Sequence, residues 1–115
     1  MPSKKHLHKF AIISALKSSK NNLRSHLIKN LNNKGIDILS ECIFNTCYVD
    51  QGLSKKDKNR IYKIYKGSEK ALKSISRKSN TTKTRRKLLS QHGASLTPIL
   101  SIGEKVLSSK IFGHS

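Results

Sequence analysis

The sequence predicts an all-α fold, a compact single-domain bundle of five or six helices with one long cationic helix. The first reason is that apolar residues recur with helical spacing along almost the whole chain. The second is that residues typical of helix starts and stops separate these segments. The third is the length of 115 residues, which fits one domain with a modest core. Because the chain has no Trp, we expect that core to consist mostly of Ile and Leu.

Two amphipathic helices are expected in the first third of the chain. Four apolar residues recur at intervals of three and mark one face of the first helix: Leu7, Phe10, Ile13 and Leu16. The polar segment 17–22 interrupts this pattern, and residues 1–5 are expected to be disordered. The second amphipathic segment covers 23–31, and Gly35 is the predicted helix stop after it.

The segment 36–49 is predicted to be the central helix, because it is apolar on more than one face. It contains the two cysteines of the chain, Cys42 and Cys47, which would project about 140° apart on a helix. Their spacing matches neither a zinc knuckle nor a secreted disulfide framework. We therefore expect both to be reduced core residues of an intracellular protein.

The longest helix is predicted over 55–77. Ser54 and Asp57 resemble the capping box that opens a helix. The apolar side of this helix falls within a sector of roughly 120° and comprises Ile61, Ile64, Tyr65, Ser68, Ala71, Leu72 and Ile75. Lysines and arginines occupy the opposite side. One face is therefore expected to pack on the core while the other carries a line of cations.

Two further helices are predicted after it. Asn80 and Thr81 are good N-cap residues for a short basic helix. Thr97 is expected to cap the last helix, with Pro98 at its first position, where proline is tolerated. This apolar C-terminal helix, 94–113, is expected either to close the core or to mediate self-association. A membrane-active amphipathic segment is the alternative.

Charge is the strongest indication of a partner. The chain has 24 Lys and Arg against 6 Asp and Glu, a formal net charge of +18. Residues 54–87 alone hold 14 basic and two acidic residues, a net charge of +12. Self-repulsion at this charge destabilises a compact monomer unless a polyanion neutralises it. Nucleic acid is therefore the expected partner, and an anionic membrane surface is the second candidate.

The basic region 54–87 supplies the candidate nucleic-acid-binding residues. These are Lys56, Arg60, Lys63, Lys66, Lys70, Lys73, Arg77, Lys78, Lys83, Arg85, Arg86 and Lys87. Their contacts with phosphate would be electrostatic and independent of sequence. Leu88 and Leu89 are expected to hold the short helix on the core, so that the three preceding cations extend the basic surface. Tyr62 either stacks on bases or packs at the edge of the core.

Enzyme activity is not predicted. The six acidic residues are scattered, and no Gly-rich phosphate loop, zinc-protease motif or nucleophile elbow occurs. His6 and His8 have no carboxylate or thiol near them in the sequence, so neither a metal nor a cofactor is expected. No secretory signal is recognisable, and no apolar run approaches the roughly 20 residues of a membrane-spanning helix.

Several motifs follow one another between residues 38 and 107: Glu41–Cys42, Asn45, Leu53–Ser54, the run Arg85–Arg86–Lys87–Leu88–Leu89, Gln91 and Gly93. In combination this region resembles the small basic proteins encoded by adintoviruses and related Polinton-like DNA elements of animals. The chain departs from that pattern in two places. Segment 48–54 lacks the proline-rich turn of that pattern. Segment 92–96 has one Gly where the pattern usually has a short motif similar to Gly-Gly-Phe-Leu.

The resemblance implies a virion core or DNA-packaging role, by analogy with the basic core proteins of adenoviruses, and a location in the virion and the host nucleus. With the charge, it predicts a non-enzymatic, largely sequence-independent protein that binds and condenses DNA. Double-stranded DNA is the favoured partner, and RNA stays open. The alternative is a structural or membrane-active minor capsid component, in which helix 94–113 acts on lipid or on a capsid protein.

Overall fold

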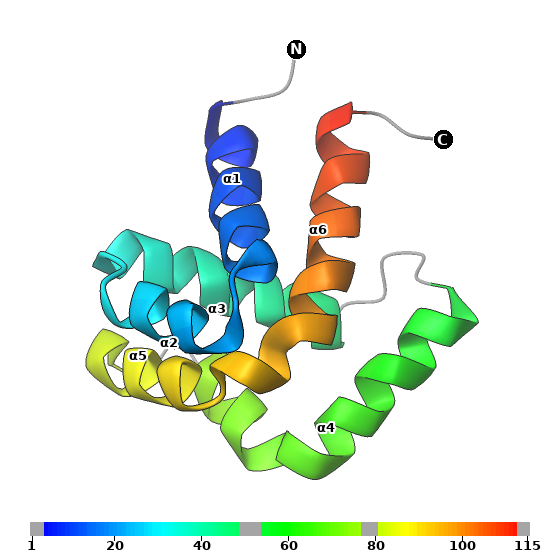
Figure 1. The fold of residues 1–115 in the computed structure, drawn as a ribbon. Coiled ribbons are helices and arrows are strands. Elements are labelled where there is room, and N and C mark those ends of the chain that lie inside the picture. Colours follow the sequence, from blue (N-terminus) through cyan, green and yellow to red (C-terminus); the bar gives the residue numbers. More distant parts are fainter. Residues whose placement is uncertain (1–3, 49–53, 77–80, 113–115) are drawn as a thin grey trace.

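The computed structural model describes residues 4–48, 54–76 and 81–112, and these residues are helical almost throughout, with no strand among them. The all-α prediction is therefore confirmed. In the described residues there are six α-helices and one 3-10 turn: α1 (Lys4–Ser18), α2 (Asn21–Lys29), α3 (Asn33–Tyr48), α4 (Lys55–Ser76), α5 (Thr82–Gln91), η1 (Gly93–Leu96) and α6 (Thr97–Phe112) (Figure 1).

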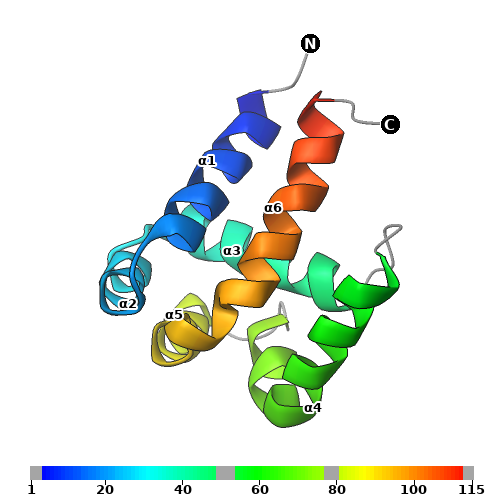
Figure 2. The same cartoon turned by 45° about the vertical axis from the view of Figure 1, so that its right-hand side comes forward.

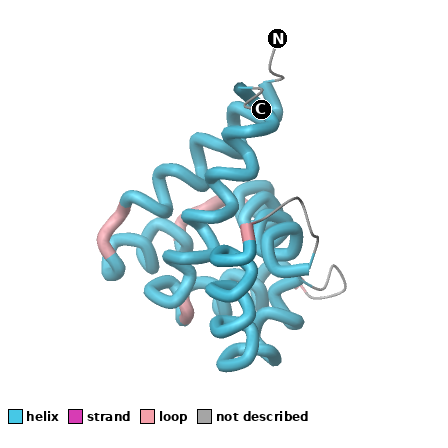
Figure 3. Tube along the Cα trace, turned by 90° about the vertical axis from the view of Figure 1, so that its right-hand side faces the viewer, coloured by secondary structure: helices cyan, strands magenta, loops and turns pink. Residues whose placement is uncertain are grey.

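The helices form one compact body with extents of 37 × 31 × 29 Å. Helices α1 and α6 lie side by side and run in opposite directions (Figures 1 and 2). Helices α2 and α5 pack together on one side of the molecule, and α4 lies on the other side. Helix α3 crosses the middle and touches α1, α4, α5 and α6. In the tube view, the described loops between α1 and α2 and between α2 and α3 are short (Figure 3).

The core consists of Ile and Leu, as the composition predicts. Each of the six α-helices contributes at least one buried side chain to it: Ile13, Ile28, Leu39, Leu72, Leu89 and Ile99 are examples. Helix α3 supplies three fully buried residues, Ile36, Leu39 and Ile43, which confirms its central position. Cys42 and Cys47 are free thiols that pack against this core.

Helix α3 starts three residues earlier than the sequence indicates, and the prediction of a helix stop at Gly35 is wrong. Gly35 is the third residue of α3. Asn32 explains the start, because its Oδ1 accepts a hydrogen bond from the Gly35 amide at 2.7 Å. This is an N-cap interaction, which satisfies one of the free amides of the first helical turn. The chain thus leaves α2 and enters α3 within a few residues.

Two of the predicted N-caps, Ser54 and Thr81, are confirmed. The Ser54 hydroxyl accepts a hydrogen bond from the Asp57 amide at 3.1 Å and opens α4. The Thr81 hydroxyl accepts one from the Thr84 amide at 3.1 Å and opens α5. Asn80 lies outside the described residues.

The start of the first helix differs from its prediction. Helix α1 begins at Lys4, within the segment 1–5 that is predicted to be disordered.

Helix α6 packs on the core along its length. Ile99, Leu100 and Ile102 are fully buried, and the last two described turns bury Ile111. A Cβ added to Gly103 would lie 2.6 Å from the Cys42 Sγ, so this glycine allows α6 to approach α3 closely. Glycine in the middle of a helix normally weakens it, but here the missing side chain creates the contact between the two helices.

Thr97 does not cap α6. Its backbone is already helical, with φ −49° and ψ −51°, because η1 runs directly into α6. The Thr97 hydroxyl instead accepts a hydrogen bond from the Arg24 Nη1 at 2.6 Å. Arg24 is only 2% exposed, and its guanidinium joins the end of α1 to the start of α6. No feature of the sequence singled this residue out.

The Arg24 guanidinium donates to four backbone carbonyls as well as to Thr97. Nε donates to the Leu16 carbonyl at 2.7 Å, and Nη1 donates to the Gly93 carbonyl at 2.9 Å. Nη2 reaches the carbonyls of Lys17 and Ser19 at 3.1 and 3.2 Å. Leu16 and Lys17 lie in the last turn of α1, where carbonyls have no partner within the helix. Burial lowers the pKa of Arg24 from its usual value. The carbonyl dipoles take the place of a counter-ion.

Candidate nucleic-acid interface

Helix α4 separates an apolar face from a cationic one. Ile61, Leu72 and Ile75 are buried on the apolar face. The six candidate residues of the described helix are all exposed: Lys56, Arg60, Lys63, Lys66, Lys70 and Lys73. We call these six side chains the α4 basic face. Lys56, Lys63 and Lys70 recur every seven residues, which places them about 10.5 Å apart along the helix axis.

The acidic residues of α4 neutralise little of this face. Asp57 is buried, with its carboxylate 3.4 Å from the Lys105 Nζ and 3.8 Å from the Arg60 Nη1. Glu69 lies 3.3 Å from the Lys73 Nζ. Lys56, Lys63, Lys66 and Lys70 make no ion pair with the described part of the chain. Four ammonium groups of the α4 basic face are therefore available to an external anion.

Tyr62 lies among these cations and not at the edge of the core. Its side chain is 62% exposed. Residues four apart are neighbours on a helix surface, so Lys58 and Lys66 flank the ring. Packing at the core edge, one of the two roles considered for Tyr62, is thus wrong. An exposed aromatic ring between two lysines has the arrangement that proteins use to stack on unpaired bases.

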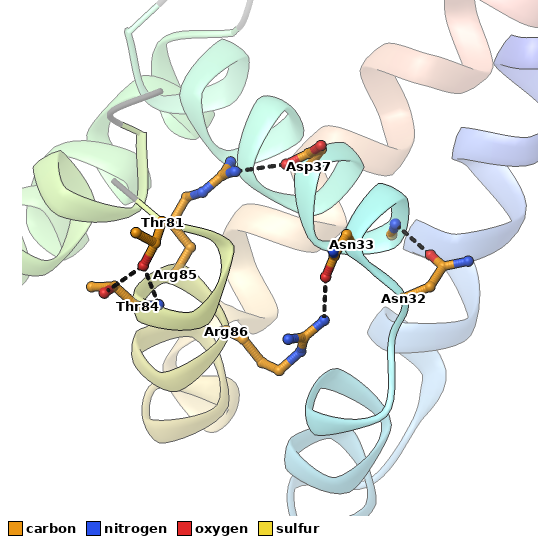
Figure 4. A network of polar contacts seen from close by, with 8 residues as sticks. Asn32, Asn33, Asp37, Thr81, Thr84, Arg85 and Arg86 are labelled. Atoms are coloured by element: carbon orange, nitrogen blue, oxygen red, sulfur yellow. Dashed lines mark hydrogen bonds and ion pairs between the residues drawn. The ribbon is translucent and has the colours of Figure 1, made fainter. Parts of the chain in front are cut away.

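Arg85 and Arg86 do not extend the basic surface, which corrects that part of the sequence-based prediction. The Arg85 side chain is only 12% exposed, and its Nη2 lies 2.6 Å from the Asp37 Oδ1 of α3. The Arg86 Nη2 donates to the Leu31 carbonyl at 2.8 Å and to the Asn33 Oδ1 at 3.1 Å. Figure 4 shows both side chains extending from α5 toward α3 and the turn before it.

The direction of these two arginines follows from the register of α5. Leu89 is fully buried, and Arg85 and Arg86 precede it by four and three residues. Residues at these spacings share a helix face, so both arginines lie over the interface between α5 and α3. Lys83 and Lys87, which are four residues apart, lie on an exposed face. Of the described cations of α5, only these two lysines can add to the α4 basic face.

We expect Arg86→Ala to destabilise the fold and Lys87→Ala to leave it unchanged. A charged hydrogen bond contributes about 1.5–3 kcal/mol, and Arg86 makes a half-buried one to the Leu31 carbonyl and an exposed, weaker one to Asn33. Substitution at an exposed position without partners changes stability by less than about 0.5 kcal/mol. Urea unfolding followed by circular dichroism measures both. Equal stabilities of the two variants would show that Arg86 has no structural role.

The cysteine thiols are poor nucleophiles. Burial raises the pKa of Cys42 to about 11 and the pKa of Cys47 to about 12, the latter with a smaller contribution from Cys42. Both thiols are therefore protonated at neutral pH. Within residues 4–48, 54–76 and 81–112, no three His, Cys, Asp or Glu side chains gather in a way that could hold a metal ion. No helix in these ranges has the length and hydropathy to span a membrane.

The candidate residues thus fall into three groups. Eight are exposed, six on α4 and two on α5. Arg85 and Arg86 hold helices together. Arg77 and Lys78 lie outside the described residues. Comparison with protein-family models, with curated proteins and with solved structures found no match to this chain. What the fold defines is a small helical protein with a cationic helix on one side.

Proposed function

We propose that this protein is a non-enzymatic DNA-binding protein that contacts duplex phosphates through the α4 basic face, largely without regard to sequence. The observation that supports this most is the set of exposed lysines on α4 that lack a partner in the described chain. Their helix is anchored by Ile61, Leu72 and Ile75 on its opposite side. The charges are thus presented on a rigid element instead of a loose tail.

The geometry suits a phosphate backbone. Helix α4 has 22 residues, which gives a length of roughly 33 Å. This is close to the roughly 34 Å of one turn of B-DNA. Lysine presents a compact point charge with rotatable donors, which favours phosphate contact over the bidentate base recognition of arginine. Tyr62 adds a ring that can stack where bases are unpaired.

Packaging is the biological role we propose for this binding. The net charge of +18 on 115 residues is large enough to neutralise a substantial stretch of nucleic acid. The resemblance to the basic proteins of adintoviruses and Polinton-like elements points in the same direction. We accordingly propose a virion core or DNA-packaging protein that acts in the virion and the host nucleus.

The membrane-active or capsid-forming alternative has less support. It relies on the apolar residues of α6, and Ile99, Leu100, Ile102 and Ile111 of this helix are buried. Helix α6 would have to leave α1 and α3 before it could insert into lipid or pair with a second copy. Such a rearrangement would expose Ile99, Leu100 and Ile102 together.

A salt titration of duplex binding tests the proposal. If five or six phosphates are neutralised, log K falls with log salt at a slope of about −5, which is about 1,000-fold between 50 and 200 mM. The expected result is this slope on duplexes of unrelated sequence, with similar affinities. Weak binding with a flat salt dependence would contradict DNA binding. A clear preference for RNA in the same series would reassign the partner.

A further inference from the structure

We propose that a second basic surface, on the opposite side of the molecule from α4, binds a second DNA segment, so that one molecule bridges two duplexes. This surface is an open groove of about 580 Å³ between the first two turns of α1 and the first half of α3. The inference rests on the proposed function and specifies how binding would become condensation.

The groove carries an excess of positive charge. Four lysines line it, Lys4, Lys5, Lys9 and Lys34, together with His8. Its two acids, Asp37 and Glu41, leave a net charge of +2 from the lining. Both acids already have partners, because Asp37 pairs with Arg85 at 2.6 Å and Glu41 pairs with Lys9 at 2.9 Å.

Three of the lysines have no such partner. Lys4, Lys5 and Lys34 are exposed and form no ion pair with the described residues. Lys4 and Lys5 lie in the first turn of α1, and Lys34 lies in the first turn of α3. Positive charge there opposes the helix dipole and weakens the fold. An external anion in the groove would relieve this repulsion.

The lining fits a phosphate backbone better than a small organic ligand. Pockets for such ligands are mostly apolar with a few polar groups. Here seven of the eight lining residues carry an ionisable group, Ile38 being the exception, and the stems of these long side chains supply much of the apolar surface. The groove is open to solvent, so an extended phosphate backbone can approach its lysines from outside.

The two basic surfaces face different directions. Figures 1 and 2 show the first turns of α1 at the top and α4 at the lower right, with α6 between them. The body measures 37 × 31 × 29 Å, well beyond the screening length of about 8–10 Å in physiological salt. Each surface therefore attracts anions independently.

A single duplex cannot easily reach both surfaces. DNA is stiff over about 150 base pairs, so wrapping it around a body of this size is costly. The lower-cost arrangement is one duplex on each surface. The α4 basic face, with more cations, would bind first, and the groove would then capture a second segment.

The test compares three double variants that each remove two exposed charges. They are Lys5→Gln/Lys34→Gln in the groove, Lys63→Gln/Lys70→Gln on α4, and, as the control, Lys20→Gln/Lys29→Gln at the two ends of α2. One assay measures affinity for a single short duplex. The other measures capture of a labelled duplex by protein bound to an immobilised duplex. The groove substitutions remove charges that oppose helix dipoles, so we expect them to leave the fold intact.

We expect the groove variant to keep its single-duplex affinity within about twofold and to lose second-duplex capture by about 60-fold at 0.1 M salt, the value for two phosphate contacts. The control should retain both activities. If the wild type binds one duplex without capturing another, bridging is refuted and DNA binding stands. If it binds neither, the proposed function fails as well.

Two other results would also overturn the bridging proposal. In the first, the groove variant loses single-duplex affinity as much as capture, which would make the groove part of the primary binding surface. In the second, capture persists in the groove variant and rises with the square of protein concentration. Two associated protein molecules would then be the bridge.

Discussion

Arg24→Met is expected to cost about 3–5 kcal/mol of the free energy of unfolding. The substitution removes the guanidinium donor from four carbonyls and from the Thr97 hydroxyl, and of these the Leu16 carbonyl keeps a hydrogen bond from the Ser19 hydroxyl at 2.7 Å. An unsatisfied buried polar group costs about 1–3 kcal/mol, although water entering at the edge will recover part of the loss. Domains of this kind are stable by about 5–15 kcal/mol, so the expected loss is a large part of the total.

The partners of Arg24 explain why an apolar side chain at position 24 cannot restore the lost stability. Replacing a buried ion pair by apolar residues is often neutral, because both charged groups disappear together. Here the acceptors are mostly backbone carbonyls of Leu16, Lys17, Ser19 and Gly93, which no substitution at position 24 removes. Arg24→Lys keeps the charge but lacks the planar fork, so we expect it to restore less than half of the loss.

Chemical denaturation followed by far-UV circular dichroism measures these effects. Lys20→Gln is a suitable control, because Lys20 is exposed and close to Arg24 in sequence. We expect its unfolding midpoint to match that of the wild type. An Arg24→Met protein with the wild-type midpoint would show that the guanidinium contacts contribute nothing to stability.

Lys63→Gln/Lys70→Gln is expected to weaken duplex binding by about 60-fold at 0.1 M salt and to reduce the salt slope by about 1.8. Each phosphate contact releases about 0.9 counterion, which is roughly eightfold in affinity at this concentration. Both lysines are exposed and lack ion pairs in the described chain, so the fold should not change. The loss should be the same for duplexes of different sequence.

The matched control separates a surface effect from a bulk charge effect. Lys20→Gln/Lys29→Gln removes the same two charges from the region of α2, on the other side of the molecule from α4 (Figure 1). We expect a loss of less than about threefold, because charges beyond a screening length contribute little. Equal losses in the two variants would mean that net charge alone drives binding and that α4 has no special role.

The sequence predicts the fold better than the site, because local rules determine the helices. Periodicity identified the central position of α3, and the hydroxyls of Ser54 and Thr81 identified two helix starts. The prediction of a helix stop at Gly35 is wrong because Asn32, three residues earlier, caps a new helix that includes Gly35. That cap is visible in the sequence, since Asn is a preferred N-cap residue.

The errors in the site come from tertiary contacts. In the sequence, Arg85, Arg86 and Lys87 form one basic run. In the helix, Arg85 and Arg86 lie on the same face as the buried Leu89 and point toward the core, whereas Lys87 points to solvent. This division could have been predicted from helical spacing. The role of Arg24 could not, because its acceptors on Gly93 and Thr97 lie about seventy residues away in sequence.

Helix α3 has a consequence for how DNA would be arranged. Its first half forms one wall of the groove, and the same helix supports α4. Helix α6 is held to the same body by the close approach of Gly103 to α3 and by the hydrogen bond from Arg24 to Thr97. Duplexes held at the two surfaces would therefore be kept at a set separation by a rigid spacer. A genome filled with such spacers would pack with a regular spacing between duplexes, whereas flexible basic tails would give an amorphous condensate.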